Sequence, residues 1–151
     1  MQDNDLFDEA VEITCDIDPR YDPEAYYFLK DALNFTCKMH NKPEKGHGRH
    51  VSAQELLEGI RLFALHEYGP MALRVLNSWG IFTTEDFGEI VFNLIEIGQL
   101  AKTKEDKKSD FANSYDFHQA FVVPFLPKSK DPPLFLRNKQ RLTQIGKRRK
   151  S

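Results

Sequence analysis

One cysteine and three histidines lie close together in the sequence, as Cys37, His40, His47 and His50. Thiolate and imidazole groups are the ligands that zinc prefers, and a structural zinc site needs four ligands in a tetrahedron. Cys37 and His40 share a face of a helix, since residues three apart are neighbours there. The gap between His40 and His47, however, matches no standard zinc module. We therefore predict no metal site, and keep the convergence of these four residues as an alternative.

Arg49 and His50 are a candidate pocket for an anion. They stand just before Ser52, which forms a capping-box pattern with Glu55 at the start of a helix. Free backbone N–H groups at a helix N-terminus attract anions, and Arg49 would add a positive charge. In the alternative interpretation, the pair is structural and bonds to backbone groups or carboxylates. We favour this alternative, because structural ion pairs also resemble sites.

Signatures of enzymes are missing from the chain. It contains no P-loop, no Gly-x-Ser-x-Gly elbow, no Gly-x-Gly-x-x-Gly and no His-Glu-x-x-His motif. A calcium loop counted from Asp16 would place Tyr21 and Tyr27 where glycine and glutamate are required. We therefore expect no catalytic residues and no cofactor.

Helical spacing of apolar residues dominates the first two thirds of the chain. It predicts helices over about 5–15, 22–40, 52–68, 70–79 and 84–97. Asp22 followed by Pro23 is typical of a helix start, and Gly69 and Gly80 are typical of helix ends. In the first helix, the apolar residues at helical spacing are Leu6, Ala10 and Ile13 with their neighbours Phe7, Val11 and Thr14.

We predict a mainly α fold: a compact helical domain over residues 1–127 and a flexible, basic, disordered tail over 128–151. The order of elements also fits a winged helix, with Val51 in a small strand, 84–97 in the recognition position and 100–117 as a β-hairpin wing. An irregular helical bundle is the equal alternative.

Composition and charge narrow the classes of function. The chain has 151 residues, of which 40% are hydrophobic and 29% charged, which excludes a membrane protein and a wholly disordered one. Two cysteines are too few for a disulfide framework, and the acidic N-terminus is no signal peptide, so we expect a cytoplasmic protein. Residues 128–151 carry a net charge of +8, and the remaining residues carry −10.

The acidic body favours a protein-interaction module without catalytic activity, which binds a basic partner or forms a homodimer. The helix in the recognition position carries four carboxylates and no lysine or arginine, so it would repel DNA. These carboxylates are Glu85, Asp86, Glu89 and Glu96.

The basic tail supports an alternative, an accessory protein that binds RNA, DNA or the ribosome. Lysine and arginine bind phosphates nonspecifically by releasing counterions. The residues that would do so are Arg137, Lys139, Arg141, Lys147, Arg148, Arg149 and Lys150.

Aromatic residues offer a third kind of candidate. Trp79 and Phe82 flank Gly80, either as an exposed anchor for a partner or as core residues around a helix end, and the second is favoured. Helical spacing leaves Phe92 near the edge of the core face, where exposure would enlarge an apolar patch.

Seven segments of the chain form a recognisable pattern, namely 18–21, 24–26, 49–61, 68–72, 85–94, 102–106 and 115–117. Together they resemble a family of small uncharacterised proteins from planctomycete and verrucomicrobial bacteria. The resemblance extends from Leu6 to Pro127 and implies a compact cytoplasmic domain with no assigned activity. It supplies no catalytic residues, and the basic tail lies outside the family pattern.

Overall fold

The computed structural model describes residues 3–42, 50–101 and 106–127, and these are mainly helical. The five predicted helices are confirmed, with ends within two residues of those expected. The α-helices are α1 (Asp3–Ile17), α2 (Pro23–Met39), α3 (Ala53–Tyr68), α4 (Ala72–Ser78), α5 (Thr84–Glu96) and α6 (Phe117–Phe121). Short 3-10 helices are η1 (Gly69–Met71), η2 (Lys108–Phe111) and η3 (Val123–Phe125).

The predicted helix starts are also confirmed. The Asp22 carboxylate accepts a hydrogen bond from the backbone N–H of Glu24 at 2.9 Å. At the start of α3, the Ser52 hydroxyl accepts from the N–H of Glu55 at 3.0 Å, and the Glu55 carboxylate accepts from the N–H of Ser52 at 2.8 Å. Each bond satisfies a backbone donor that the first turn of a helix leaves free.

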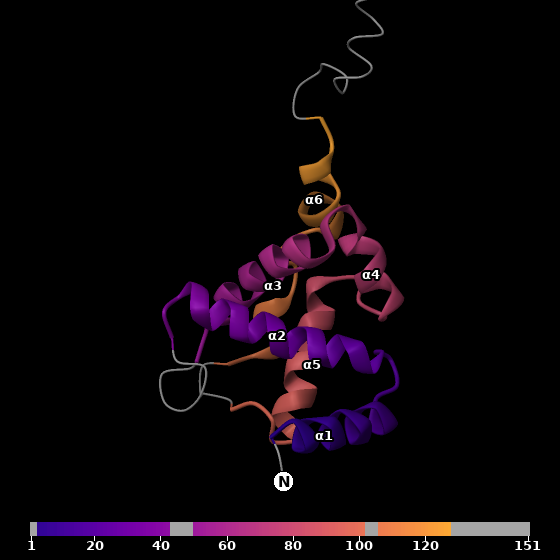
Figure 1. Ribbon diagram of the computed structural model, residues 1–151, viewed down its shortest axis with the longest axis vertical. Helices are drawn as coiled ribbons and strands as arrows, with labels where there is room; N and C mark the ends of the chain where they lie inside the picture. Colours follow the sequence, from indigo (N-terminus) through magenta and orange to yellow (C-terminus); the bar gives the residue numbers. More distant parts are fainter. Residues whose placement is uncertain (1–2, 43–49, 102–105, 128–151) are drawn as a thin grey trace, which may run out of the picture.

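The helix α5 runs through the middle of the body (Figure 1). It contacts α1, α2 and η2, while α2 and α3 form the most extensive helix pair. Figure 1 shows α1 lying across one end of the body, and α6 with η3 at the opposite end. The chain therefore presents different elements at its two ends.

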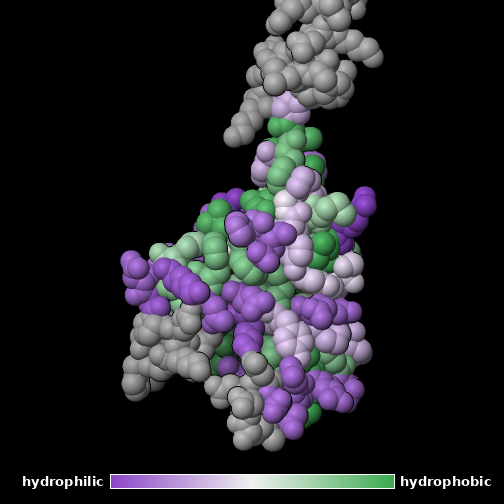
Figure 2. Space-filling view, in the orientation of Figure 1, coloured by the Kyte–Doolittle hydropathy of each residue, from purple (hydrophilic) through white to green (hydrophobic). Residues whose placement is uncertain are grey.

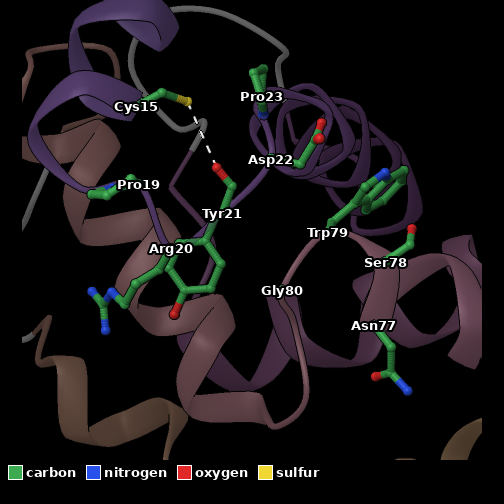
Figure 3. Close-up of a pocket in the computed structure, with 10 residues that line it drawn as sticks. All are labelled: Cys15, Pro19, Arg20, Tyr21, Asp22, Pro23, Asn77, Ser78, Trp79 and Gly80. Carbon is green, nitrogen blue, oxygen red and sulfur yellow. Dashed lines mark hydrogen bonds between the residues drawn. The ribbon is translucent and has the colours of Figure 1, made fainter.

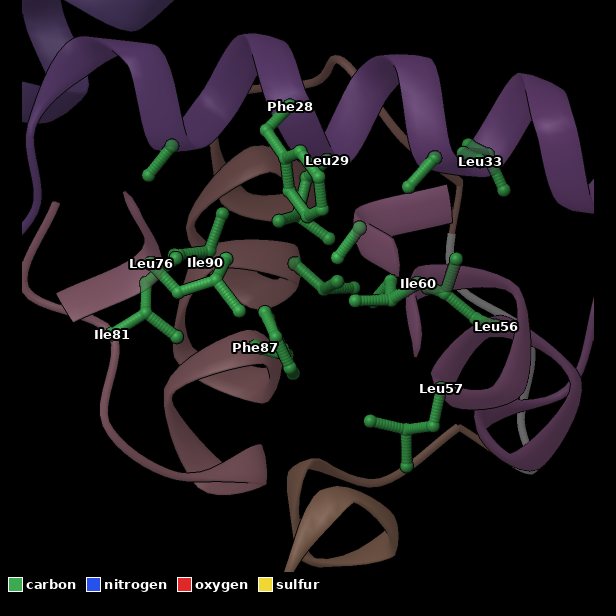
Figure 4. Packing of buried hydrophobic residues seen from close by; sticks show 14 of the residues in the cluster. Phe28, Leu29, Leu33, Leu56, Leu57, Ile60, Leu76, Ile81, Phe87 and Ile90 are labelled. Atoms are coloured by element: carbon green, nitrogen blue, oxygen red, sulfur yellow. The ribbon is translucent and has the colours of Figure 1, made fainter. Parts of the chain in front are cut away.

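The hydrophobic core lies between these helices (Figure 4). Leu29 from α2, Ile60 from α3 and Ile90 from α5 meet there and are almost completely buried. Their burial follows the helical spacing in the sequence. The other large side chains of the innermost core are Tyr26, Leu57, Leu76, Ile81, Phe87, Leu94 and Phe121.

The β-hairpin wing is not confirmed, and neither is the winged-helix arrangement. The described residues contain no strand: Val51 is buried in an irregular segment, and the region expected to form the wing contains η2 and the start of α6. Phe111 at the end of η2 and Phe117 at the start of α6 are buried against the body from these helical turns, not from paired strands. Residues 102–105 of the expected wing lie outside the described residues.

A glycine in α5 explains how this segment packs. A Cβ atom added to Gly88 would lie 2.9 Å from Cβ of Phe111. The missing side chain therefore lets η2 approach α5 closely. The order of helices expected for a winged helix is present, but tertiary packing of aromatic residues determines the shape of the C-terminal segment.

Two further predictions concern the limits of the body. Residues 128–151, the expected tail, lie outside the described residues, so the boundary at 127 and the tail's disorder stay predictions. Within the described ranges, none of the helices combines the length and the hydrophobicity that crossing a bilayer requires.

Candidate interaction surface

The four candidate metal ligands do not converge in the part of the chain that the structure describes. Cys37 is fully buried in α2, whereas His40 caps the end of that helix, with its Nδ1 3.4 Å from a carboxylate oxygen of Glu55. His47 lies outside the described residues. Among residues 3–42, 50–101 and 106–127, no three histidine, cysteine or acidic side chains are arranged to hold a metal ion.

The candidate anion pocket is lined by carboxylates where it is described. His50 Nε2 lies 3.4 Å from Oδ1 of Asp106, and the Lys42 ammonium donates to the His50 carbonyl at 2.8 Å. Lys42 also donates to Glu55 at 3.0 Å. His50 therefore lies beside a carboxylate, as the structural alternative expects of this one residue. Arg49 lies outside the described residues, so an anion pocket that uses it stays a prediction.

Glu55 already occupies the positive end of α3. The hydrogen bond from the N–H of Ser52, followed by that from Lys42, lowers the pKa of Glu55 from 4.5 to about 2. A carboxylate with donors of this kind is ionised at neutral pH. An external anion would have to displace it.

The acidic residues of α5 serve partly to hold the fold together. Asp86 accepts hydrogen bonds from the N–H groups of Phe82 at 2.8 Å and Thr83 at 3.1 Å, and from the hydroxyl of Tyr21 at 2.6 Å. Glu89 accepts from Arg20 at 2.9 Å, and the hydrogen bond from Arg20 lowers its pKa. These two carboxylates are therefore already paired within the chain, which weakens the prediction that the acidic residues of this helix attract a basic partner.

A polar network joins the turn between α1 and α2 to α5. Arg20 donates to Asp18 at 2.7 and 2.8 Å, and these bonds lower the pKa of Asp18. The amide of Asn93 donates to Asp18 and to the Tyr26 hydroxyl, both at 3.0 Å. Asp18 thus accepts hydrogen bonds from both Arg20 and Asn93, and it links the turn to α5.

A pocket of about 510 Å³ lies between this turn and the end of α4 (Figure 3). The Cys15 thiol donates to the carbonyl of Tyr21 at 3.8 Å, and burial raises the pKa of this thiol. A raised pKa leaves less thiolate and so a weaker nucleophile. Asn77 carries a buried Oδ1 without a hydrogen-bond partner in the described residues, but Figure 3 shows this side chain pointing away from Tyr21 and Cys15.

Trp79 and Phe82 have different environments. Trp79 packs against Phe28 and Tyr68, with ring centroids 5.5 and 5.9 Å apart, so it is partly buried against the core. Phe82 is exposed. Phe92 is half-buried against the core, which agrees with its expected position at the edge.

The outer face of α1 carries an apolar stripe. Leu6, Ile13 and Ile17 are 46%, 49% and 75% exposed. They lie within about 40° of one another around the helix, because each residue advances by about 100°. The residues that α1 buries form a separate row, namely Phe7, Ala10, Val11 and Thr14.

Beside the stripe runs a row of carboxylates. Asp5, Glu9, Glu12 and Asp16 are exposed and follow one another at spacings of four, three and four residues. This row is centred about 90° from the stripe, on the side away from the core. None of the four forms an ion pair with a cation in the described residues. We call the stripe and the acidic row together the α1 face.

The described chain ends in a second exposed apolar group. Phe125 and Leu126 are 46% and 47% exposed at the end of η3. Figure 2 shows hydrophobic side chains on this projecting end, where the body meets the grey residues. The cations assigned to nucleic-acid binding all follow in the sequence and lie outside the described residues, namely Arg137, Lys139, Arg141, Lys147, Arg148, Arg149 and Lys150.

Comparison with protein-family models, curated proteins and solved structures finds no match to this chain. The resemblance to planctomycete and verrucomicrobial proteins therefore stays a prediction.

The sequence contained a signal for the α1 face that was not recognised. The apolar residues of α1 form two parallel rows, which together cover more of the helix surface than a helix buried on one side needs. One of the two rows must therefore be exposed. Leu6 and Ile13 were grouped with the buried row, whereas the structure exposes them.

Proposed function

We propose that this protein is a noncatalytic interaction module that binds a basic, amphipathic protein segment along the α1 face. The observation that carries the proposal is the exposed stripe of Leu6, Ile13 and Ile17 directly beside the acidic row, which forms no ion pair with any cation that the structure describes. A helix with alternate apolar and cationic faces would cover both at once, in the manner of helix-in-groove recognition.

Apolar burial would supply part of the binding free energy. Moving one fully exposed leucine or isoleucine side chain out of water is worth about 1.5–3 kcal/mol. Because the three side chains are half to three-quarters exposed, each offers a fraction of that amount. Loss of rotational and translational freedom opposes this gain, so the electrostatic part matters.

The acidic row would supply the electrostatic part. Asp5 with Glu9, Glu9 with Glu12, and Glu12 with Asp16 are like-charged neighbours on one helix, and such pairs cost about 0.2–0.5 kcal/mol each. Asp16 also lies in the last turn of α1, where the helix dipole disfavours a carboxylate. Lysine or arginine side chains of a partner would relieve these repulsions.

Binding of a model peptide tests the proposal. The probe is a fluorescent helical peptide of leucine and lysine with separate apolar and cationic faces, and the control peptide has the same composition in scrambled order. We expect the full chain to bind the first peptide more tightly, with an affinity that falls as salt rises.

Variants of the chain locate the binding site. Replacing Leu6, Ile13 and Ile17 by glutamine is expected to weaken binding at least tenfold, whereas Met71→Gln with Phe82→Gln, which changes exposed apolar residues elsewhere, leaves it unchanged. Equal binding by the α1 variant and the wild type would refute the proposal.

A second candidate function is nonspecific binding of RNA by the tail, and the net charge of +8 over residues 128–151 favours it. Single-stranded RNA that contacts all seven assigned cations would show a slope of log K against log salt of about −5. Replacing those cations by glutamine in the full chain would then abolish retention of total RNA. If that variant still retained RNA, or if binding by the wild type did not change with salt, the tail would be excluded as the RNA site.

A further inference from the structure

We infer that the α1 face of one copy binds the C-terminal segment of a second copy of this chain, so that copies associate head to tail. The inference rests on the proposed function and names the partner of the same surface. Its occupant is the segment that begins at Phe125 and continues through the basic residues to Lys150.

The C-terminal segment is the chemical complement of the α1 face. It begins with the exposed side chains of Phe125 and Leu126, and the 24 residues after them from 128 onward hold nine cations and one acid. The α1 face has an apolar stripe beside carboxylates. Apolar residues would cover the stripe, while cations would face the acidic row.

The positions of the two surfaces favour a second copy over the same molecule. α1 lies across one end of the body, and η3, which holds Phe125, lies at the other (Figure 1). The body separates the two, so the exposed Phe125 and Leu126 of one molecule do not meet its own α1. A neighbouring copy can bring them there without any rearrangement of the described residues.

The charges of the chain agree with this arrangement. The body carries −10 and residues 128–151 carry +8, so each contact between copies would bring opposite charges together. Because the two surfaces differ, the contact is heterologous, and every added copy presents one new surface of each kind.

Charge reversal tests the contact while preserving the fold. Glu9→Lys with Glu12→Lys reverses the centre of the acidic row and converts two repulsive pairs, with Asp5 and Asp16, into attractive ones. Lys147→Glu with Arg148→Glu, Arg149→Glu and Lys150→Glu reverses the end of the tail. Each variant is expected to weaken self-association of the full chain about tenfold or more in sedimentation velocity at low salt.

The matched control is Glu67→Lys with Glu96→Lys. It makes the same change of net charge as the α1 variant at exposed carboxylates of α3 and α5. We expect it to self-associate as the wild type does. Circular dichroism checks that all variants remain helical.

A mixture of the two reversed variants gives the most specific outcome. The normal tail of the α1 variant can bind the normal α1 face of the tail variant, and the two reversed surfaces also attract each other, so the mixture should regain the association that each variant alone has lost. A chain that carries both reversals should associate with itself again for the same reason. Recovery by this chain does not follow from a contact between two α1 faces or between two tails, because each of these would join like charges.

Three results would overturn the inference: a monomer at all concentrations, equal association of the wild type and the α1 variant, or no complex in the mixture. A monomer whose α1 face still binds the leucine–lysine peptide would leave the proposed function standing. A monomer that binds no such peptide would refute both.

Discussion

At the scale of single residues, Gly59 shows how closely α2 and α3 pack. A side-chain carbon at this position would overlap Oγ1 of Thr36 and lie 2.9 Å from its Cβ. Alanine normally favours a helix over glycine by about 1 kcal/mol. We expect Gly59→Ala to destabilise the protein instead, by about 1–3 kcal/mol, because overpacking outweighs the helical preference. Urea denaturation followed by circular dichroism measures the change.

The partner of this contact provides the control. Thr36→Ala removes the overlapping hydroxyl, so the double variant should be less destabilised than the sum of the two single variants. Additive costs, or a stabilising Gly59→Ala, would show that the two helices can move apart freely.

Residues that act locally were the ones the sequence could predict. Asp22 and Ser52 cap helices within three residues of themselves, and both roles are confirmed. The hydrogen bonds from Tyr21 to Asp86 and from Arg20 to Glu89 join residues 65 and 69 positions apart. No local sequence pattern predicts such pairs, because only the folded structure brings the two residues together.

At the scale of one element, the capping box of α3 makes stability depend on pH. The pKa of Glu55 falls from 4.5 to about 2 on folding, so its ionised form stabilises the folded state. That contribution is complete above about pH 4.5 and is lost as the pH falls towards 2. We expect Glu55→Gln to cost about 1 kcal/mol at pH 7 and almost nothing near pH 2, by urea denaturation across this range.

Ser52→Ala is the control, since it removes the other half of the box without changing an ionisable group. Its cost should persist at low pH. A constant cost of Glu55→Gln over the same range would mean that the carboxylate charge adds nothing.

The helix α1 shows the limit of periodicity as a guide. Apolar spacing correctly predicted a helix there, yet it could not tell which of two apolar rows would be buried. That choice depends on the neighbours that the fold supplies, chiefly α2 and α5. The site proposed here is therefore the part of the surface that the sequence described least well.

At the scale of the whole molecule, residues 106–127 are joined to the helical body through Tyr115. The hydroxyl of this half-buried side chain donates to the carbonyl of Leu57 in α3 at 2.8 Å, and burial raises its pKa. We expect Tyr115→Phe to lower the free energy of unfolding by about 1 kcal/mol. Fluorescence of Trp79, the single tryptophan, and circular dichroism should shift together if the body unfolds as one unit.

Tyr27→Phe is a matched control, because the Tyr27 hydroxyl donates to the exposed Asp8. Its cost should be smaller. Separate transitions for the two probes would instead indicate that the surroundings of Trp79 unfold independently of the other helices.

The class of the fold follows from the sequence, whereas the shape of its C-terminal part does not. Helical periodicity and caps specify α1 to α5. The segment after α5 has aromatic residues without a clear period, and Gly88 creates the space that Phe111 fills. The same sequence is compatible with a hairpin and with an aromatic segment packed on the body. The space at Gly88 on α5 favours the packed segment, because Phe111 fills it.

The two cysteines differ in burial, so their rates of reaction with a thiol reagent report on the opening of the core. Cys15 is half-buried and its raised pKa slows alkylation at neutral pH, while Cys37 is fully buried in α2. A thiol reagent should modify Cys15 in the native protein and reach Cys37 only when α2 separates from its neighbours. The ratio of the two rates then measures how often the core opens in the absence of denaturant.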